Sequence, residues 1–499
     1  MIEGILIGLQ TALSFKNLMM VMIGCFSGTI IGMLPGLGPM TAIALMIPIT
    51  YGFDPSTGLI LMAGVYYGAV FGGSTSSILI NAPGVPGTVA TSFDGYPMAQ
   101  QGKAGKALAI AAYSSFAGGT ISAIFLLIAA PSLSLVSLSF RSPDYFGLMI
   151  LGLTAVAAFS SKGNFLKAMM MVVLGLMLAS VGQDTLSDIP RFTFDNMNLS
   201  DGISFVLVVM ATFAMSEALT IIFKANDPSK AAKRISLSQL GSIKLDKDET
   251  KKMITTIPRS SVLGFIIGVL PGAGATIASF LAYGMERNFV NDEEKQKFGK
   301  GSVNGIAAPE TANNAACSGS FVPLLTLGIP GSGTTAVMLG ALLGFGIQPG
   351  PRLYQTNPEI FWSVIMSMYI GMVVLLILNL PLIPYIARVL ATPRTFLIPL
   401  ILFFSLTGVY LMSFNNFDIY MMIGIAVVAT LLRLYDFPMP PLILAFVLGG
   451  LMEENLRRSL LISDGSWSFM WDRPLTIVIM LTIIFIVGWQ IYKSFFKDK

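Results

Sequence analysis

The sequence predicts an all-α polytopic membrane protein with about 10–12 membrane segments. It further predicts two inverted repeats, each containing a Pro/Gly-broken helical hairpin, an architecture that can support elevator-type movement. Three observations lead to this prediction: the apolar composition, a motif that occurs twice, and the distribution of Lys and Arg among the loops.

The composition is that of a membrane protein. Of the 499 residues, 54% are hydrophobic and 11% are charged, whereas soluble domains have about 25% charged residues. Apolar stretches long enough to cross, or nearly cross, a hydrocarbon core of about 30 Å lie at 361–386, 395–412, 417–432 and 474–492. We interpret the net charge of +4 as a consequence of membrane orientation, and we expect no nucleic-acid partner.

The repeated motif places Pro and Gly inside apolar sequence. Residues 28–45 (GTIIGMLPGLGPMTAIAL) and 264–281 (GFIIGVLPGAGATIASFL) are identical at ten of eighteen positions, at an offset of 236. Gly permits positive φ and close backbone approach, while Pro ends a helical hydrogen-bond ladder. The helix that begins after each turn exposes N–H groups, which suit a carboxylate. A matched pair of such interrupted segments is the best sequence indication of a transporter's substrate site.

A second repeated segment follows each turn. Gly84-Val85-Pro86-Gly87 recurs as Gly328-Ile329-Pro330-Gly331 at an offset of 244, and Ser74 and Ser76 then correspond to Ser318 and Ser320. Hydroxyls, amides and unwound backbone supply neutral donors for an anion and oxygen ligands for a small cation. The predicted substrate-binding residues are Pro35, Gly36, Gly38, Ser74, Thr75, Ser76, Asn81, Pro271, Gly272, Gly274, Ser318, Ser320, Gly331 and Ser332.

The candidate coupling-ion group lies just before the second polar cluster. It consists of Glu310, Thr311, Asn313 and Asn314. An ionisable group at membrane depth is a functional hypothesis by default, and this carboxylate could coordinate Na⁺ or carry a proton. The chain has no histidine, and its two cysteines are isolated, so we expect no cofactor and no metal other than Na⁺. Glu217, near the end of the apolar stretch 203–223, is expected to be paired or to reach the interface.

Loop charges predict the domain organisation. Residues 224–259 carry nine Lys/Arg against four acids and form a predicted cytoplasmic linker. The linker separates a first membrane half, 1–223 with repeat core 17–107, from a second half, 260–499 with repeat core 260–350. The C-terminus is also predicted to be cytoplasmic.

The same rule predicts that the repeats are inverted. The segment after the first unit, with Lys103 and Lys106, is assigned inside, so its counterpart at 348–352 must lie outside. Likewise the loop 51–57 is poor in cations, while its counterpart 285–300 is rich in them. Inverted repeats are common in secondary transporters.

Three alternatives remain open at this stage. The Pro-Gly turns and the hydroxyl clusters could serve only helix packing. A passive anion channel could also use inverted repeats, and only accumulation against a gradient would separate it from a transporter. An intramembrane enzyme with Ser74 or Ser76 as nucleophile would need an adjacent base, but histidine is absent and no lysine lies close in sequence. We therefore expect no enzyme activity.

Several long motifs resemble the large membrane subunit of the tripartite tricarboxylate transporters, the TctA family. They read GMLPGLGP, YYGAVFGGSTSSILINAPGVPGT, FDGYP, VLPGAGA, APETANNAA and LGIPGSGTTAVMLGAL. The resemblance implies a permease of the bacterial cytoplasmic (inner) membrane that works with a small membrane subunit and a periplasmic solute-binding protein. It also implies import of citrate-like tricarboxylates or other organic carboxylates by symport, driven by a Na⁺ or H⁺ gradient.

Overall fold

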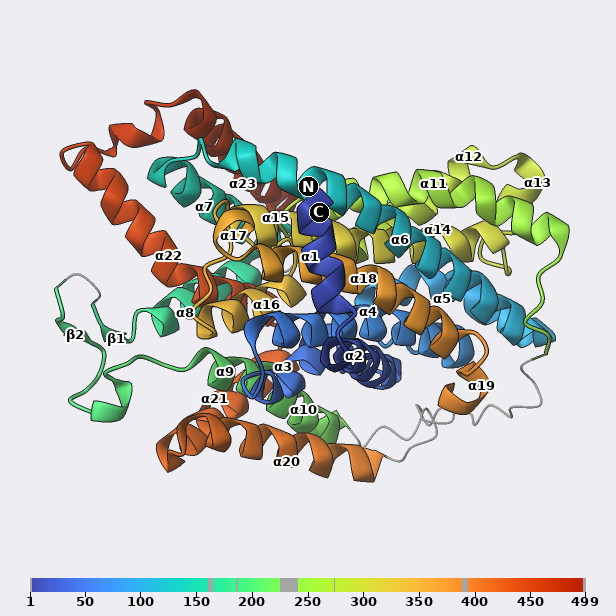
Figure 1. Cartoon of the computed structure of the whole chain (residues 1–499), viewed down its shortest axis with the longest axis horizontal. Coiled ribbons are helices and arrows are strands. Elements are labelled where there is room, and N and C mark those ends of the chain that lie inside the picture. Colours follow the sequence, from blue (N-terminus) through green and yellow to red (C-terminus); the bar gives the residue numbers. More distant parts are fainter. Residues whose placement is uncertain are drawn as a thin grey trace.

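Helices make up most of the part of the chain that the structure describes. The computed structural model describes residues 2–159, 165–184, 187–224, 241–272, 274–387 and 394–496. Ala273 of the second Pro-Gly turn, residues 225–240 of the predicted linker and the C-terminal residues 497–499 lie outside this set. Figure 1 shows helices crossing the whole molecule, with a small β-ribbon at its left edge.

The first half contains both 3₁₀ segments (η1, η3) and π-helical segments (η2, η4) between its α-helices. The elements are α1 Ile2–Ala12, α2 Phe15–Met33, α3 Gly38–Thr50, α4 Pro55–Ile80, η1 Pro86–Thr88, α5 Val89–Met98, η2 Ala99–Lys103, α6 Ala104–Ser137, α7 Ser142–Phe159, α8 Phe165–Ala179, β1 Gly182–Gln183, β2 Pro190–Arg191, η3 Met197–Leu199, α9 Phe205–Val209, η4 Met210–Met215 and α10 Ser216–Lys224.

The second half repeats the order hairpin, central helix, break and short helix. Its elements are α11 Lys247–Val269, α12 Gly274–Phe289, α13 Asp292–Lys295, α14 Val303–Gly319, α15 Phe321–Leu327, α16 Gly333–Gly344, α17 Leu353–Thr356, α18 Pro358–Asn379, α19 Ile383–Ile386, α20 Arg394–Ser413, α21 Asn416–Leu434, α22 Pro440–Ile462, the 3₁₀ segment η8 Trp467–Met470 and α23 Pro474–Phe496. Helix α11 begins within the range 224–259 that was assigned to the linker.

The two predicted hairpins are confirmed. Helices α2 and α3 meet at the first Pro-Gly turn, and α11 and α12 meet at the second. One predicted span is shorter than expected: the apolar stretch 361–386 is divided, because α18 ends at Asn379. Leu380 precedes Pro381, and a residue before proline is disfavoured in helical backbone.

Small residues let each hairpin pack closely on its central helix. A Cβ added to Gly28 of α2 would lie 2.3 Å from the carbonyl oxygen of Val65 in α4. A Cβ on the equivalent Gly264 of α11 would lie 2.5 Å from the carbonyl oxygen of Ala312 in α14. Close helix contacts of this kind are typical of membrane proteins, and here both repeats use them at the same position.

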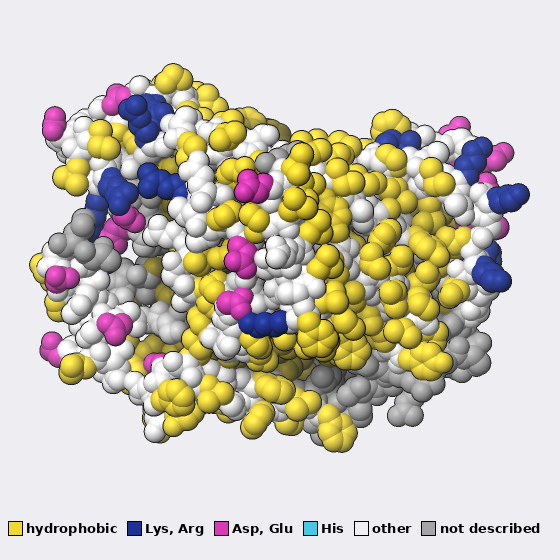
Figure 2. Space-filling view, in the orientation of Figure 1, with side chains coloured by type: hydrophobic (Ala, Val, Ile, Leu, Met, Phe, Trp, Pro, Cys, Tyr) yellow, Lys and Arg dark blue, Asp and Glu magenta, His cyan; other side chains and the backbone are white. Residues whose placement is uncertain are grey.

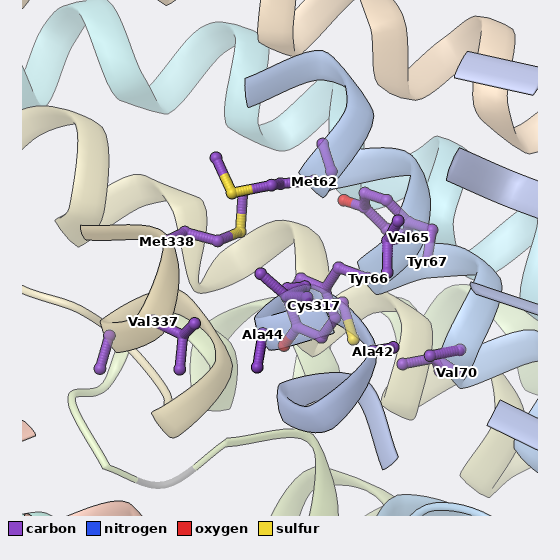
Figure 3. Packing of buried hydrophobic residues seen from close by; sticks show 14 of the residues in the cluster. Ala42, Ala44, Met62, Val65, Tyr66, Tyr67, Val70, Cys317, Val337 and Met338 are labelled. Atoms are coloured by element: carbon purple, nitrogen blue, oxygen red, sulfur yellow. The ribbon is translucent and has the colours of Figure 1, made fainter. Parts of the chain in front are cut away.

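Helices α4 and α14 form the centre of the molecule. Every residue of α14, and every residue of α4 from Ser56 to Leu79, is buried. The halves interlock around them: α6 of the first half packs on α14, and α18 of the second half packs on α4. Figure 3 shows Tyr66 and Tyr67 of α4 among labelled side chains of α3, α14 and α16. Polar residues on these two helices are therefore shielded from lipid.

The outer helices present an apolar surface. Among the described residues, six helices are long and apolar enough to cross a membrane, and several shorter apolar helices accompany them. Figure 2 shows hydrophobic side chains over the broad middle of one face, with charged side chains gathered toward the two ends of the long axis and along a line left of centre. The protein is therefore a multi-pass membrane protein, as the composition predicted.

Contacts join loops that lie far apart in the sequence. At the segments assigned to the cytoplasm, Lys106 pairs with Glu249 at 2.8 Å, and Lys252 pairs with Glu294 at 2.9 Å. Elsewhere the ring of Tyr51, at the end of α3, lies 4.9 Å from that of Phe345, at the end of α16. Ion pairs and ring contacts thus connect the ends of helices from both halves.

The β-ribbon lies between α8 and α9. Strands β1 and β2 are antiparallel, with Gly182 opposite Arg191. Arg457 of α22 donates to Asp184 at 3.0 Å, and Arg191 donates to Glu453 at 2.8 Å. These ion pairs fasten the loop to the end of α22.

Candidate functional site

The backbone of both Pro-Gly turns requires glycine. In the first turn Gly36 has φ +98° and Gly38 has φ +63°. In the second turn Gly272 has φ +82° and Gly274 has φ +63°. L-residues with side chains rarely adopt these angles. Pro35 and Pro271, which cannot donate a backbone hydrogen bond, begin the breaks, so both turns are built by the same local chemistry.

The second turn lies against the break of its own repeat. The amide of Gly272 donates to the carbonyl oxygen of Gly331 at 3.0 Å. A Cβ on Gly274, where α12 begins, would lie 3.9 Å from the Cβ of Ser332, which caps α16. Two helices therefore begin side by side, and their N-terminal N–H groups and dipoles favour a negative charge at this point.

The first turn meets an ion pair that the sequence did not predict as part of the site. A Cβ on Gly36 would lie 2.9 Å from Oε1 of Glu217. Glu217 pairs with Arg433 of α21, so the expectation that this carboxylate is paired is confirmed. Arg433 also donates to the carbonyl oxygen of Thr212 at 3.0 Å, within the π-helical η4. π-Helical turns are frequent at functional sites.

Each repeat's break faces the central helix of the other repeat. A Cβ on Gly87 would lie 2.3 Å from Oδ1 of Asn313, on α14. In the second repeat, the hydroxyl of Ser332 in the break lies 3.5 Å from the hydroxyl of Tyr66, which is on α4 of the first repeat. Helix α12 packs against η1, and α3 packs against α16. The predicted substrate residues of the two halves are thus brought together around α4 and α14.

Glu310 lies inside a cage of hydroxyl groups. Its Oε2 accepts hydrogen bonds from Ser74 at 2.6 Å and from Ser115 at 2.9 Å, and its Oε1 accepts one from Thr91 at 2.5 Å. The side chain is fully buried. Among the described residues no Lys or Arg forms an ion pair with it. Three donated hydrogen bonds stabilise a charged carboxylate that has no basic partner.

The position equivalent to Glu310 carries a phenol instead of an acid. The 244-residue offset that relates Ser74 to Ser318 relates Tyr66 to Glu310. Ser318 shares a hydrogen bond of 2.7 Å with the hydroxyl of Tyr67, the neighbour of Tyr66. The repeats therefore build two related hydroxyl clusters, of which one contains a carboxylate.

The amides beside Glu310 have unused polar atoms. Asn314 donates to the carbonyl oxygen of Glu310 at 3.0 Å, but its Oδ1 has no partner among the described residues. Within the same set neither amide atom of Asn313 has a partner, although the side chain is 1% exposed. Thr311 instead donates to the carbonyl oxygen of Ser114 at 3.3 Å and joins α14 to α6. Buried amide groups without partners are rare in folded proteins, so these atoms are candidates for contact with a ligand or water.

The remaining predicted residues have mainly local contacts. Ser76 donates to the carbonyl oxygen of Gly73 at 3.1 Å, and Ser320 donates to that of Cys317 at 2.8 Å. Asn81 ends α4 in a left-handed conformation and is exposed.

Several site residues were missed by the sequence reasoning. Thr91 and Ser115 donate to Glu310, Tyr66 lies within hydrogen-bond distance of Ser332, and Arg433 pairs with the Glu217 carboxylate that lies beside Gly36. Only Tyr66 had a usable signal, because the 244-residue offset aligns it with Glu310. The other three lie far in the sequence from the residues that they contact, and only the packing of distant helices reveals them.

The fold and the site define a multi-pass membrane protein with paired hairpins around two buried helices that carry polar residues. Comparison with known proteins specifies the family. The model of the tripartite tricarboxylate transporter TctA family matches residues 18–444. The chain belongs to this family.

Two similar proteins come from Agrobacterium vitis. An uncharacterized 52.8 kDa protein in the TAR-I ttuC' 3' region is 42% identical over 475 residues, which cover 95% of this chain and 93% of that protein. An uncharacterized protein in the TAR-II ttuC' 3' region is 42% identical over 212 residues, covering 42% of this chain and 87% of that protein. No solved structure matches the chain.

Proposed function

We propose that this chain is the large permease subunit of a binding-protein-dependent tripartite system, which imports tricarboxylates or related organic carboxylates by symport with Na⁺ or H⁺. The proposal rests on the TctA family membership and above all on one observation. Glu310 is a fully buried carboxylate, held by three hydroxyl groups, on a central helix that neighbours both helix breaks.

The surroundings of the breaks favour an anionic substrate. Helices α12 and α16 begin side by side, and the unpartnered amide of Asn313 offers a neutral donor next to the other break. Substrate carboxylates held by helix N-termini and amides need no Lys or Arg in the repeat cores. Of the family's substrate range, citrate-like molecules carry the most charge and gain most from such donors.

Burial of charge explains why a cation would accompany the substrate. Moving an anion through a low-dielectric site is costly unless another charge offsets it. A cation near Glu310 would compensate this carboxylate, and its release would make the site unfavourable for further anion binding. Coupling then follows from electrostatics.

The proposal includes the cellular context. The chain would lie in the bacterial inner membrane with the linker 224–259 and the C-terminus in the cytoplasm, together with a small membrane subunit and a periplasmic solute-binding protein. Both hairpins and both breaks would move as one elevator-like unit against the outer helices.

Glu310→Gln tests the proposal in proteoliposomes that contain the whole tripartite complex. We expect gradient-driven uptake to fall at least tenfold and its ion dependence to change, because the neutral amide removes the charge that attracts the cation. Glu454→Gln is the control, since Glu454 forms an exposed pair with Arg458 on α22. Unchanged ion dependence in Glu310→Gln would remove Glu310 from the coupling role.

A further inference from the structure

A small cavity with both polar and apolar walls lies beside the hydroxyl cage of Glu310. Its volume is about 10 Å³, close to the minimum that holds one water molecule or one small ion. Ser74 and Thr75 of α4, Ser115 of α6 and Asn379 of α18 provide its polar lining, and Phe71 and Leu108 are among its apolar walls. Helices of both halves thus meet around one space that apolar packing leaves open.

Asn379 gives this cavity an unused oxygen. Its Nδ2 donates to the carbonyl oxygen of Leu375 at 3.0 Å, whereas its Oδ1 has no partner among the described residues. The side chain is only 4% exposed. Leaving a buried amide oxygen unpaired costs about 1–3 kcal/mol. An occupant that accepts this lone pair would remove the cost.

The position of Asn379 favours a positive occupant. It is the last residue of α18, a helix of 22 residues. The negative end of a helix dipole lies at its C-terminus and stabilises cations there. In secondary transporters, C-terminal ends of interrupted helices are known locations of coupling ions.

Two hydroxyls connect the cavity to the carboxylate. Ser74 and Ser115 both line the cavity, and both donate a proton to the same atom, Oε2 of Glu310. A hydroxyl that donates to a carboxylate becomes a better acceptor at its own oxygen, because hydrogen bonds in a chain polarise one another. The negative charge of Glu310 is thereby felt in the cavity without direct contact.

We propose that this cavity binds Na⁺, with oxygen ligands from Ser74, Thr75, Ser115 and Asn379 and with Glu310 as the charge behind them. Four neutral oxygens and one carboxylate fit a hard monovalent cation, whereas Ca²⁺ and Mg²⁺ sites use carboxylate ligands directly. The assignment deepens the proposed function, on which it rests, by naming the coupling ion and adding Ser115 and Asn379 to its site.

The test measures Na⁺ binding by the purified full-length chain in lipid nanodiscs. The midpoint of thermal unfolding is followed against NaCl concentration, with choline chloride holding the ionic strength constant and KCl as the comparison. A ligand that binds only the folded state raises the midpoint as its concentration grows. We expect Na⁺ to raise it, and Asn379→Leu and Thr75→Val to weaken the apparent Na⁺ affinity at least tenfold.

Matched variants separate ion binding from folding defects. Thr75→Ser keeps the hydroxyl and should keep the affinity within about twofold of wild type. Asn455→Leu removes an amide with the same local hydrogen bond, from Asn455 to the carbonyl oxygen of Leu451, on α22, which does not line the cavity, and should not change the affinity. If Asn379→Leu does not fold, comparing the apparent Na⁺ affinity of Thr75→Val with that of Thr75→Ser still shows whether the Thr75 hydroxyl binds Na⁺.

Three results would overturn the Na⁺ site: no difference between NaCl and choline chloride in wild type, an equal response to KCl, or unchanged Na⁺ affinity in Asn379→Leu and Thr75→Val. Uptake by the complete complex separates this inference from the proposed function. Accumulation driven by a proton gradient, with no effect of Na⁺, would leave the transporter standing and reject the site. Na⁺ binding without any accumulation of substrate would support the Na⁺ site and reject the proposed transport function.

Discussion

Ser74 and Ser318 occupy equivalent positions of the two repeats, so replacing each by alanine gives a matched pair of perturbations. Ser74 donates to the carboxylate of Glu310 at 2.6 Å, and Ser318 bonds the neutral hydroxyl of Tyr67 at 2.7 Å. Both serines are buried, with 4% and 0% exposure. Only the charge of the partner differs substantially.

The magnitudes follow from that difference. Side-chain hydrogen bonds in a membrane protein contribute about 0.6 kcal/mol on average and at most about 1.7 kcal/mol. Bonds to an ionised group are roughly twice as strong as neutral ones. We therefore expect Ser74→Ala to lower the free energy of unfolding by about 1.2 kcal/mol, twice the average value, and Ser318→Ala by about 0.6 kcal/mol.

The assay is equilibrium unfolding in mixed micelles, carried out in the native background and again in Glu310→Gln. With a neutral acceptor the cost of Ser74→Ala should fall to about 0.6 kcal/mol, while the cost of Ser318→Ala should stay the same. A cost for Ser74→Ala no larger than that for Ser318→Ala would refute the reasoning. So would an unchanged cost of Ser74→Ala in the Glu310→Gln background.

Three further predictions test the hairpins, the movement and a loop ion pair. Gly272→Leu should abolish uptake, because φ is +82° and a Cβ would lie 2.5 Å from a backbone nitrogen of α7, whereas Gly284→Leu on the same hairpin meets open space and should retain uptake. Cysteines replacing Pro48 of α3 and Gly408 of α20, where the Cβ atoms would lie 3.2 Å apart, should form a disulfide that blocks uptake until it is reduced. Full uptake by the oxidised pair would contradict elevator-like movement. Partial burial raises the pKa of Asp54. Hydrogen bonds from its lysine partner and from nearby hydroxyls lower the pKa by a larger amount, so the folded-state pKa lies well below the usual range. The resulting stabilisation, below about 1 kcal/mol for a half-exposed pair, should be present above about pH 4 and be lost as the pH falls through the folded-state pKa. Comparing the unfolding of wild type with that of Asp54→Asn across this range checks the sign.

The hairpins could be predicted because their cause is local. Proline at 35 and 271 and glycine at 36 and 272 impose the break whatever surrounds them, and the structure places a turn at each. The polar residues around Glu310 identified it as a candidate coupling group, but the sequence left its depth in the membrane open. Local backbone chemistry and repetition therefore predicted most of the fold.

The partners of Glu310 could not be predicted, because they come from three other helices. Thr91 and Ser115 reach it from α5 and α6 only after the two halves interlock. Asn379 resembles any asparagine at the end of an apolar helix until the cavity beside it is known. A single sequence contains no distances between such elements, so tertiary packing decides which of many isolated polar residues form the site.

Uptake of a labelled tricarboxylate panel tests the central claim most directly. The proteoliposomes contain this chain, its small membrane subunit and its solute-binding protein, and Na⁺ and H⁺ gradients are imposed separately without ATP. We expect accumulation above the external concentration under a Na⁺ gradient. Equilibration without accumulation under either gradient would contradict coupled transport and support a passive pore.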